Sequence, residues 1–194
     1  MKSVVLLGSV LLLSACGSMQ SQVVKKNVAF NPDSQAQIRS YGSYGSDLIR
    51  IYPETDCAKW EGTKRNAVNR RFVNGLPRKV RNISIGIPPT ELSRKTEKDT
   101  GFVFRDSYRE MVVSANQPVV LDGAFSSQTR NHHYSCRVAA SFTPKAGEAY
   151  EVRYLSEEEG CDIEVYHIGH EEKDGIRQTK KLTANYCARP GTSF

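Results

Sequence analysis

The chain is predicted to fold as an all-β protein, an antiparallel β-sandwich with two disulfides. Short runs of alternating apolar and polar residues recur along it, turn-forming residues separate these runs, and four cysteines besides Cys16 are available for pairing. Short strands at such spacing are typical of sandwiches and barrels. A single domain over residues 36–194 is expected, long enough to bury a core of its own.

The first half of this domain is predicted to contain three strands and one long irregular loop. Residues 37–41 and 47–52 have strand character, and the Gly- and Ser-rich segment 42–46 between them suits a hairpin loop. Residues 54–79 show no period because Asn, Gly and Pro interrupt them, so an irregular loop is expected after this first hairpin. Alternating isoleucines then predict a strand over 80–87.

The second half is predicted to be strands, after a charged segment over 90–101 that forms a loop or a short helix. The strands are expected over 102–104, 108–114, 119–121, 133–142, 149–155, 161–168 and 176–186. The turns between them are predicted at Asn116-Gln117-Pro118, Asp122-Gly123, Pro144-Lys145-Ala146-Gly147, Glu159-Gly160 and Asp174-Gly175.

The four cysteines of the predicted domain are expected to form two disulfides. An even number of cysteines is typical of an exported chain in an oxidising compartment. Strand alternation places Cys136 and Cys161 on apolar faces, so both point into the core. A hairpin closed at Asp174-Gly175 would return Cys187 close to Cys161. We therefore expect the pairs Cys161–Cys187 and Cys57–Cys136, although four cysteines allow three pairings.

Three segments of the second half form a recognisable set: VVSANQPVVL over 112–121, FTPKAGEAYEV over 142–152 and CDIEV over 161–165. Together they resemble the closing strands of immunoglobulin- or transthyretin-like sandwiches in small proteobacterial lipoproteins. The most distinctive part is the Phe-x-Pro-x-Ala-Gly-x-x-Tyr loop from Phe142 to Tyr150. The resemblance implies a sandwich fold and carries no catalytic residue.

The N-terminus combines Lys2, a small-or-apolar run from Ser3 to Leu13, and the sequence Leu13-Ser14-Ala15-Cys16. The run is about half as long as a transmembrane helix, and the whole order is similar to a bacterial lipoprotein signal peptide with its lipobox. The resemblance implies removal of residues 1–15 and lipidation of Cys16, which anchors the protein in a membrane. Residues 16–35 are then expected to form a flexible tether. Since no Asp follows Cys16, we expect the outer membrane, with the domain facing the periplasm or the cell surface.

Charge is unevenly distributed along the chain. Lys and Arg number 27 against 21 Asp and Glu, and the loss of Lys2 lowers the formal net charge from +6 to +5. Residues 59–81 are strongly basic, and the candidate binding residues within them are Lys64, Arg65, Arg70, Arg71, Arg78, Lys79 and Arg81. Residues 145–175 are correspondingly acidic. Two solvated surfaces that attract each other explain this pattern; the alternative is a docking face for anionic lipid, lipopolysaccharide, peptidoglycan or an acidic protein.

The residue types that carry catalysis or bind metals do not form a known arrangement. Histidines occur as His132-His133 and as His167-x-x-His170. Neighbouring strand residues point to opposite faces, so the first pair is poorly placed to chelate one ion, and His167 is expected to pack against the core. The chain has neither a Gly-x-Ser-x-Gly motif nor a phosphate-binding Gly-rich loop. We therefore predict no enzymatic activity, no metal and no cofactor.

Aromatic and basic residues occur together in the predicted first hairpin. Tyr41, Tyr44 and Tyr52 lie near Arg39 and Arg50 in the sequence. Cross-strand pairing is the simpler explanation, and a patch that binds carbohydrate or a protein is the alternative.

The sequence as a whole predicts a lipid-anchored cell-envelope protein with a non-enzymatic binding, accessory or structural role. The expected partner is another envelope protein. One alternative is an anionic glycan or lipopolysaccharide bound through residues 59–81, and another is a metal-binding or hydrolytic periplasmic protein. Nucleic acid is not expected as a partner of a chain that is tethered outside the cytoplasm.

Overall fold

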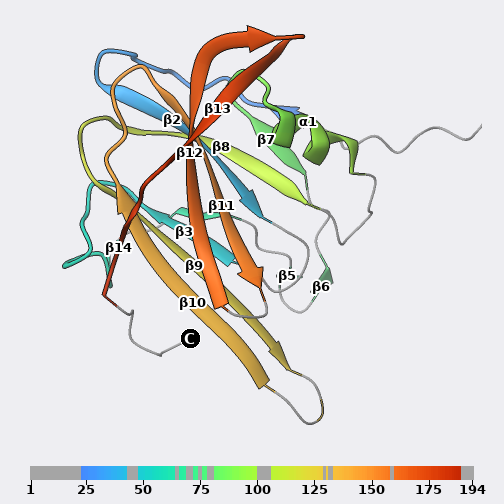
Figure 1. Ribbon diagram of the computed structural model, residues 1–194, viewed down its shortest axis with the longest axis vertical. Helices are drawn as coiled ribbons and strands as arrows, with labels where there is room; N and C mark the ends of the chain where they lie inside the picture. Colours follow the sequence, from blue (N-terminus) through green and yellow to red (C-terminus); the bar gives the residue numbers. More distant parts are fainter. Residues whose placement is uncertain are drawn as a thin grey trace, which may run out of the picture.

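Two stacked β-sheets form the body of the protein (Figure 1). The computed structural model describes residues 23–42, 48–63, 66–68, 72–73, 76–77, 81–99, 106–128, 130, 133–157 and 160–188. One sheet has seven strands, the other has five, and a third small sheet has two. The predicted all-β sandwich is therefore confirmed.

The strands follow one another across each sheet in an order that differs from their order in the sequence. The seven-stranded sheet consists of β1 (Val23–Lys25), β7 (Asn82–Ser84), β8 (Ser107–Ser114), β2 (Gln35–Gly42), β11 (Ala149–Glu157), β12 (Gly160–Lys173) and β13 (Ile176–Leu182). The five-stranded sheet consists of β14 (Asn185–Tyr186), β10 (His133–Phe142), β9 (Val119–Gln128), β3 (Leu48–Tyr52) and β4 (Asn66–Val68). The small sheet pairs β5 (Phe72–Val73) with β6 (Leu76–Pro77).

The core lies between the two larger sheets because one face of each long strand is apolar. Ile38 in β2 and Val152 in β11 pack from one sheet, and Ile51 in β3 and Leu121 in β9 pack from the other. All four side chains are fully buried, and full burial of such a side chain contributes about 1.5–3 kcal/mol. The residues on the opposite face of each strand point outward from the sandwich.

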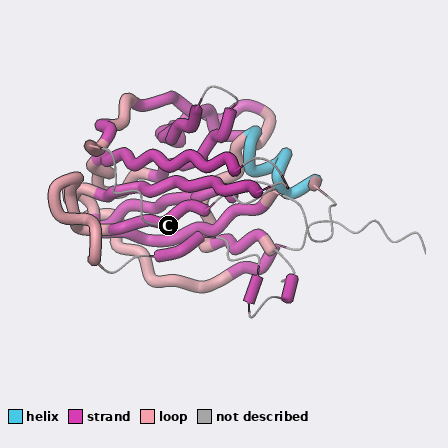
Figure 2. Tube along the Cα trace, turned by 90° about the horizontal axis from the view of Figure 1, so that it is seen from below, coloured by secondary structure: helices cyan, strands magenta, loops and turns pink. Residues whose placement is uncertain are grey.

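Helix α1 (Glu91–Lys98) lies on one side of the layered strands (Figure 2). It begins with a capping box: the Thr90 hydroxyl accepts from the Ser93 N–H, and the Ser93 hydroxyl accepts from the Thr90 N–H. Glu91 in the first turn and Lys98 in the last turn suit the helix dipole. The short-helix alternative for residues 90–101 is thus the correct one. Within the described part of the chain, no helix is long and apolar enough to cross a membrane.

The predicted hairpin between residues 37–41 and 47–52 is wrong, although both strands exist. β2 lies between β8 and β11 in the seven-stranded sheet, whereas β3 pairs with β9 and β4 in the other sheet. The sandwich is also not purely antiparallel as predicted, because β2–β11, β1–β7 and β7–β8 are parallel pairs. Alternation within a strand predicts which side is buried and says nothing about its neighbours.

The strand predicted over 80–87 is shorter than expected. β7 ends at Ser84, and the backbone N–H groups of Ile85, Gly86 and Ile87 all donate to the carboxylate of Glu110 in β8. These donors are directed at a side chain and do not continue a strand ladder. The isoleucine alternation therefore extends beyond the strand itself.

The flexible tether predicted over residues 16–35 is wrong from Val23 onward. β1 pairs in parallel with β7, and the Lys26 N–H donates to the Ser84 carbonyl at 2.8 Å. A turn closed by the Gln35 N–H on the Asn31 carbonyl then leads into β2. The folded domain therefore includes residues well before 36.

One of the predicted turns is confirmed and another is wrong. Asp174 and Gly175 form the two-residue loop between β12 and β13 with positive φ angles of 55° and 74°, as an Asp-Gly hairpin turn requires. Asp122-Gly123 is not a turn, because both residues lie within β9. Gly123 is needed there for space, since a Cβ atom would lie 2.2 Å from the Tyr154 ring. Residues 102–104 and Glu159 lie outside the described residues.

The two disulfides are confirmed, but the predicted pairing is wrong: Cys136 bonds Cys161, and Cys57 bonds Cys187. Cys136 in β10 and Cys161 in β12 join the two sheets, as their core-facing positions allow. The chain leaves the seven-stranded sheet after Leu182, and β14 pairs with β10 in the other sheet. This change of sheet takes Cys187 away from Cys161 and toward the loop that follows β3.

Candidate functional site

An open groove of about 740 Å³ lies on the outer face of the seven-stranded sheet. We call it the α1 groove. Glu91, Leu92 and Lys95 of α1 form one wall, and Glu151, Arg153 and Tyr166 of β11 and β12 form the floor. The turn and strand of the β12–β13 hairpin form the other wall, with Lys173, Asp174, Ile176, Arg177, Gln178 and Thr179. The groove thus exists because a short helix and a long hairpin stand on the same sheet face.

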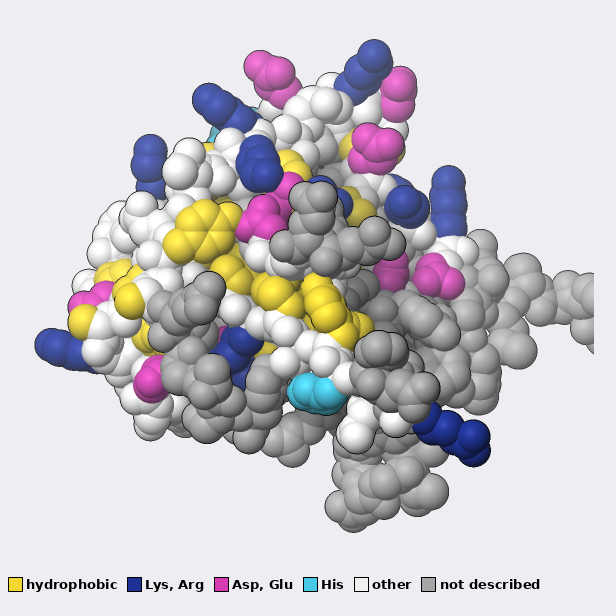
Figure 3. All heavy atoms as spheres, turned by 60° about the horizontal axis from the view of Figure 1, so that its bottom comes forward, with side chains coloured by type: hydrophobic (Ala, Val, Ile, Leu, Met, Phe, Trp, Pro, Cys, Tyr) yellow, Lys and Arg dark blue, Asp and Glu magenta, His cyan; other side chains and the backbone are white. Residues whose placement is uncertain are grey.

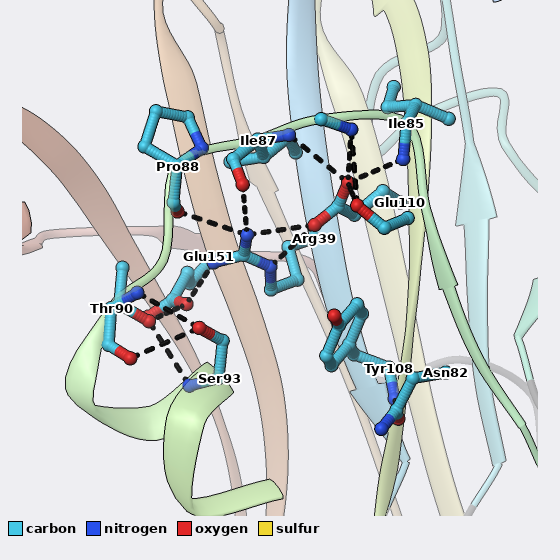
Figure 4. Close-up of polar contacts among 12 residues, drawn as sticks. Arg39, Asn82, Ile85, Ile87, Pro88, Thr90, Ser93, Tyr108, Glu110 and Glu151 are labelled. Atoms are coloured by element: carbon cyan, nitrogen blue, oxygen red, sulfur yellow. Dashed lines mark hydrogen bonds and ion pairs between the residues drawn. The ribbon is translucent and has the colours of Figure 1, made fainter. Parts of the chain in front are cut away.

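Beneath this face lies a buried ion network centred on Arg39 (Figure 4). The guanidinium is 2.8 Å from the carboxylate of Glu110 and 3.0 Å from that of Glu151. It also donates to the carbonyls of Ile87 and Pro88, at 2.8 and 3.0 Å. The Arg39 side chain is only 2% exposed. β8, β2 and β11 are neighbours in the sheet, so three adjacent strands supply the three charges.

Glu110 connects this network to the segment that leads into α1. One oxygen, Oε2, accepts hydrogen bonds from the Ser84 hydroxyl and from the N–H groups of Ile85, Gly86 and Ile87. The other oxygen contacts Arg39. A buried carboxylate needs such donors because desolvation of an unpaired charge is costly. Glu110 therefore fixes the path of the chain from β7 toward the helix.

Glu151 connects the network to the helix and reaches the groove. Its Oε1 accepts from Arg39, from the Tyr41 hydroxyl at 2.5 Å and from the hydroxyl of Thr90, the N-cap residue of α1. Glu151 is 3% exposed and also lines the groove floor. The start of the helix is thus held against the sheet by a carboxylate at the bottom of the groove.

The surroundings of Tyr41 and Arg39 fix the protonation states of these two residues. Burial and the charge of Glu151 raise the pKa of Tyr41 well above its ordinary value. Burial by itself lowers the pKa of Arg39, but Tyr41, Glu110 and Glu151 raise it by more, so the net pKa lies above its ordinary value. Tyr41 therefore stays neutral and Arg39 stays charged near neutral pH. This behaviour suits a structural network better than an acid or base that exchanges protons.

The groove surface carries both charge signs and some apolar side chains. Arg153 lies 2.5 Å from Glu164, and its guanidinium carbon is 5.4 Å from the centre of the Tyr166 ring. Lys95 and Lys173 are exposed, and neither forms an ion pair with another described residue. Such a surface can contact a ligand that combines charged groups with apolar ones.

A second charge cluster lies on the outer face of the five-stranded sheet. Asp122 in β9 accepts from Arg50 of β3 at 2.9 Å and from Arg137 of β10 at 2.8 Å. The Asp122 side chain is fully buried, whereas the two arginine side chains are 19% and 15% exposed. The Trp60 ring lies 5.3 Å from the guanidinium carbon of Arg137 and packs edge-on against Tyr52.

The structure separates the residues of the predicted aromatic and basic patch. Arg39 and Tyr41 lie in the network beneath α1, and Arg50 and Tyr52 lie on the opposite face of the molecule. A single binding patch of these residues is therefore excluded. The prediction failed because it assumed that β2 and β3 pair.

Most of the predicted basic binding residues lie outside the described residues: Lys64, Arg65, Arg70, Arg71, Arg78 and Lys79. The same holds for Cys16, Tyr44 and His132. Arg81 is described; it is exposed and directly precedes β7. The acidic segment 145–175 pairs largely with cations of its own sheet, since Glu151 contacts Arg39 and Glu164 contacts Lys181 at 2.7 Å.

His167 and His170 both approach Glu148, with their Nε2 atoms 2.5 and 3.6 Å from its Oε2. The hydrogen bond from His167 lowers the pKa of Glu148 below its ordinary value. The His167 ring also packs against Tyr150, with centroids 5.5 Å apart, as expected for a packed histidine. In the parts of the chain that the structure describes, no group of three or more His, Cys, Asp or Glu side chains is placed to hold a metal ion.

Hydrophobic side chains gather in a band at the end of the sandwich where the β9–β10 hairpin lies (Figure 3). Tyr134 in this hairpin is 41% exposed, and its ring centroid lies 5.7 Å from that of Phe125. This surface has a different character from the α1 groove, whose lining is mainly polar and charged.

Sequence reasoning missed Glu110, Glu151 and Thr90 as parts of the site. Glu110 and Glu151 occupy outward-facing positions of their strands, opposite the core residues, where charged side chains are ordinarily solvated. The capping pattern of Thr90 and Ser93 was the one usable signal, because it marks the start of a helix. Comparison of the chain with protein-family models, with curated proteins and with solved structures found no match.

Proposed function

We propose that the protein is a lipid-anchored, non-enzymatic binding protein of the cell envelope, with the α1 groove as its binding site. Cys16 carries the anchor, and the outer membrane is the proposed location. The observation that carries the binding role is the groove itself: its floor includes Glu151, which belongs to the buried network beneath the floor, where Arg39 binds Glu110 and Glu151 and where Glu151 holds the start of the helix. A rigid floor of this kind suits recognition, because little conformational freedom is lost when a ligand binds.

The proposed ligand is a segment of another envelope protein. Leu92, Ile176 and Tyr166 offer apolar contact, and the groove walls also carry Lys95 and Lys173 together with the carboxylates of Glu91 and Asp174. Mixed charges with interspersed apolar side chains match a polypeptide better than a uniformly anionic polymer. Recognition of this type depends on a few central contacts surrounded by a polar rim.

In-cell photocrosslinking tests the binding role. A photoreactive residue at Gln178, which is exposed and lines the groove, should capture one defined protein. The matched control is Gln117, which is also exposed but lies in the turn between β8 and β9. Capture of the same proteins from both positions would contradict a partner in the groove.

Charge dependence separates this proposal from its main alternative, an anionic glycan or lipopolysaccharide bound through residues 59–81. Glycan binding through clustered cations should weaken steeply as salt rises from 50 to 500 mM, since exposed charges are screened. Substitution of Arg70, Arg71, Arg78 and Lys79 by Gln should then abolish it. A crosslink at Gln178 that survives both the salt and these substitutions supports the groove.

The anchor has a test of its own. Cys16→Ser should abolish acyl labelling of the chain and block removal of residues 1–15. Normal processing of this variant, observed by mass spectrometry of the mature N-terminus, would overturn the lipid anchor and leave the groove proposal standing.

A further inference from the structure

One edge of the seven-stranded sheet is exposed and basic. β1 is the outermost strand; its last residue, Lys25, and the four residues that follow it, up to Ala29, are all exposed. They include Lys25 and Lys26 and the side chain of Val28, which is 43% exposed. Arg81 is also exposed and directly precedes β7, the strand that pairs with β1. We call Lys25, Lys26, Val28 and Arg81 the basic edge.

No carboxylate in the neighbouring sequence offsets these cations. Neither residues 23–32 nor residues 81–90 contain Asp or Glu. The nearest strand beyond β7 is β8, and its Glu110 is buried and committed to Arg39 and to the N–H groups of Ile85, Gly86 and Ile87. The basic edge therefore presents its charge to whatever lies next to it.

The length of chain between Cys16 and β1 limits how far the β1 edge can lie from the bilayer. Seven residue steps separate Cys16 from Val23, so even a fully extended chain spans at most roughly 25 Å. The opposite edge of the same sheet, β13, is six strand spacings away, or roughly 29 Å. An anchor at Cys16 therefore keeps the β1 edge within roughly 25 Å of the bilayer, whereas the β13 edge can lie farther from it.

We propose that the basic edge docks on the anionic phospholipid surface of the membrane. The inference rests on the proposed lipid anchor and adds an orientation to it. Lys25, Lys26 and Arg81 meet phosphate headgroups, and Val28 enters the boundary between headgroups and acyl chains. Docking in this way turns the α1 groove, which lies between α1 and the β12–β13 hairpin, toward soluble or surface partners.

The number of cations in the basic edge determines how strongly the edge is expected to bind an anionic membrane surface. Each Lys or Arg at an anionic membrane surface contributes about fivefold to partitioning, so the three cations contribute roughly a hundredfold. The attraction acts only within a Debye length of the membrane surface. Added salt shortens this length, so the contribution decreases as the salt concentration rises. It is large enough to select one orientation for a domain that the anchor already holds at the membrane.

Fluorescence quenching by headgroup-labelled lipid tests the orientation. The mature lipidated protein is placed in nanodiscs that contain phosphatidylglycerol, or in nanodiscs of phosphatidylcholine alone. A fluorescent amino acid at Asn27, within the exposed stretch, should be quenched strongly in the anionic discs and weakly in the neutral ones. The same fluorophore at Gln178 should be quenched weakly in both.

Two charge-matched triple variants give the controls. Lys25→Gln, Lys26→Gln and Arg81→Gln together should remove the quenching at Asn27. Lys59→Gln, Lys145→Gln and Lys180→Gln remove the same charge from exposed positions outside the basic edge and outside the α1 groove, and should leave the quenching unchanged. Equal quenching at Asn27 and Gln178, equal quenching in both lipids, or docking only on lipopolysaccharide would overturn the inference.

The mass of the mature chain separates this inference from the proposal on which it rests. A chain without acyl groups would overturn the anchor and the docking together. A chain that carries its acyl groups but shows no preference between Asn27 and Gln178 would overturn the docking alone. Circular dichroism of each triple variant confirms that the compared proteins are folded.

Discussion

The two outer faces of the sandwich carry charge clusters of opposite composition. On the seven-stranded sheet, the cation Arg39 lies between the carboxylates of Glu110 and Glu151. On the five-stranded sheet, the carboxylate of Asp122 lies between the cations Arg50 and Arg137. The first cluster is sealed from solvent, whereas both arginines of the second retain some exposure.

The difference explains why one face carries a helix and a groove. Two carboxylates beside one guanidinium leave acceptor oxygens that must be satisfied. The donors come from Thr90, from Ser84 at the end of β7 and from the N–H groups of the segment that follows β7. The network therefore organises chain that is not part of the sheet. Arginines at the surface of the other face can donate to water, so no covering helix is needed there.

The five-stranded face is instead closed covalently. The Cys57–Cys187 bond ties the loop after β3 to the end of β14, and the Cys187 N–H donates to the Ala139 carbonyl of β10. Trp60, from the same loop, is buried against this face. One face is thus held by ionic hydrogen bonds and the other by a disulfide.

Removal of the Cys57–Cys187 bond should have the largest effect on stability. A sequence separation of 130 residues predicts a loss of roughly 5 kcal/mol, against roughly 3.5 kcal/mol for the 25-residue separation of Cys136–Cys161. Urea unfolding of the two double alanine variants measures both. The reverse order would contradict the chain-entropy explanation, and peptide mapping without reductant checks the pairing directly.

Arg39→Met should destabilise the protein by about 3–5 kcal/mol, because it leaves two buried carboxylates without their cation. The triple variant Arg39→Met, Glu110→Gln and Glu151→Gln should recover much of this loss, since no unpaired charge is left. Urea unfolding followed by circular dichroism measures each variant. A loss below about 1 kcal/mol for the single variant would show that the network does not hold the start of the helix against the sheet.

Asp122→Asn should cost less, about 2 kcal/mol, because the partly exposed Arg50 and Arg137 can regain water when the charge-assisted hydrogen bonds are lost. The same unfolding measurement applies, with Asp33→Asn as a control that changes the charge equally at an exposed position outside both clusters. If Asp122→Asn proves as damaging as Arg39→Met, the contrast between a sealed face and a hydrated one is wrong.

Low pH should destabilise the face of the seven-stranded sheet that carries the groove, because it protonates Glu164. Its burial raises its pKa, but hydrogen bonds from Lys181, Arg153 and Tyr166 lower it by more, so the folded pKa lies below the ordinary value of 4.5. The stabilisation is therefore complete above pH 4.5 and is lost as the pH falls through the lower folded pKa. Unfolding midpoints between pH 7 and pH 3 should decline more steeply for the natural chain than for Glu164→Gln. If the unfolding midpoints of the two proteins decline in parallel with falling pH, Glu164 does not contribute to the loss of stability in acid.

Parts of the fold and of the site were within reach of sequence reasoning. β10 coincides with its predicted range, and the Asp174-Gly175 turn and the core-facing positions of Cys136 and Cys161 were predicted correctly. The disulfide pairing was predicted wrongly, because it depends on the change of sheet at β14, which no local pattern shows. The burial of Glu110 and Glu151 was not predicted, because it depends on where a distant helix packs.

The sequence by itself determined the class of the fold, most of the long strands and the face that each of these strands buries, whereas β1 and the short strands β4, β5 and β6 were not predicted. The predicted features follow from a period of two, which is local and does not depend on the rest of the chain. Only the tertiary structure decided that β2 lies between β8 and β11, that β14 changes sheet and takes Cys187 with it, and that Arg39 is sealed beneath α1. Strand pairing and the burial of outward-facing charges are long-range properties, because several alternative neighbours satisfy the same local pattern.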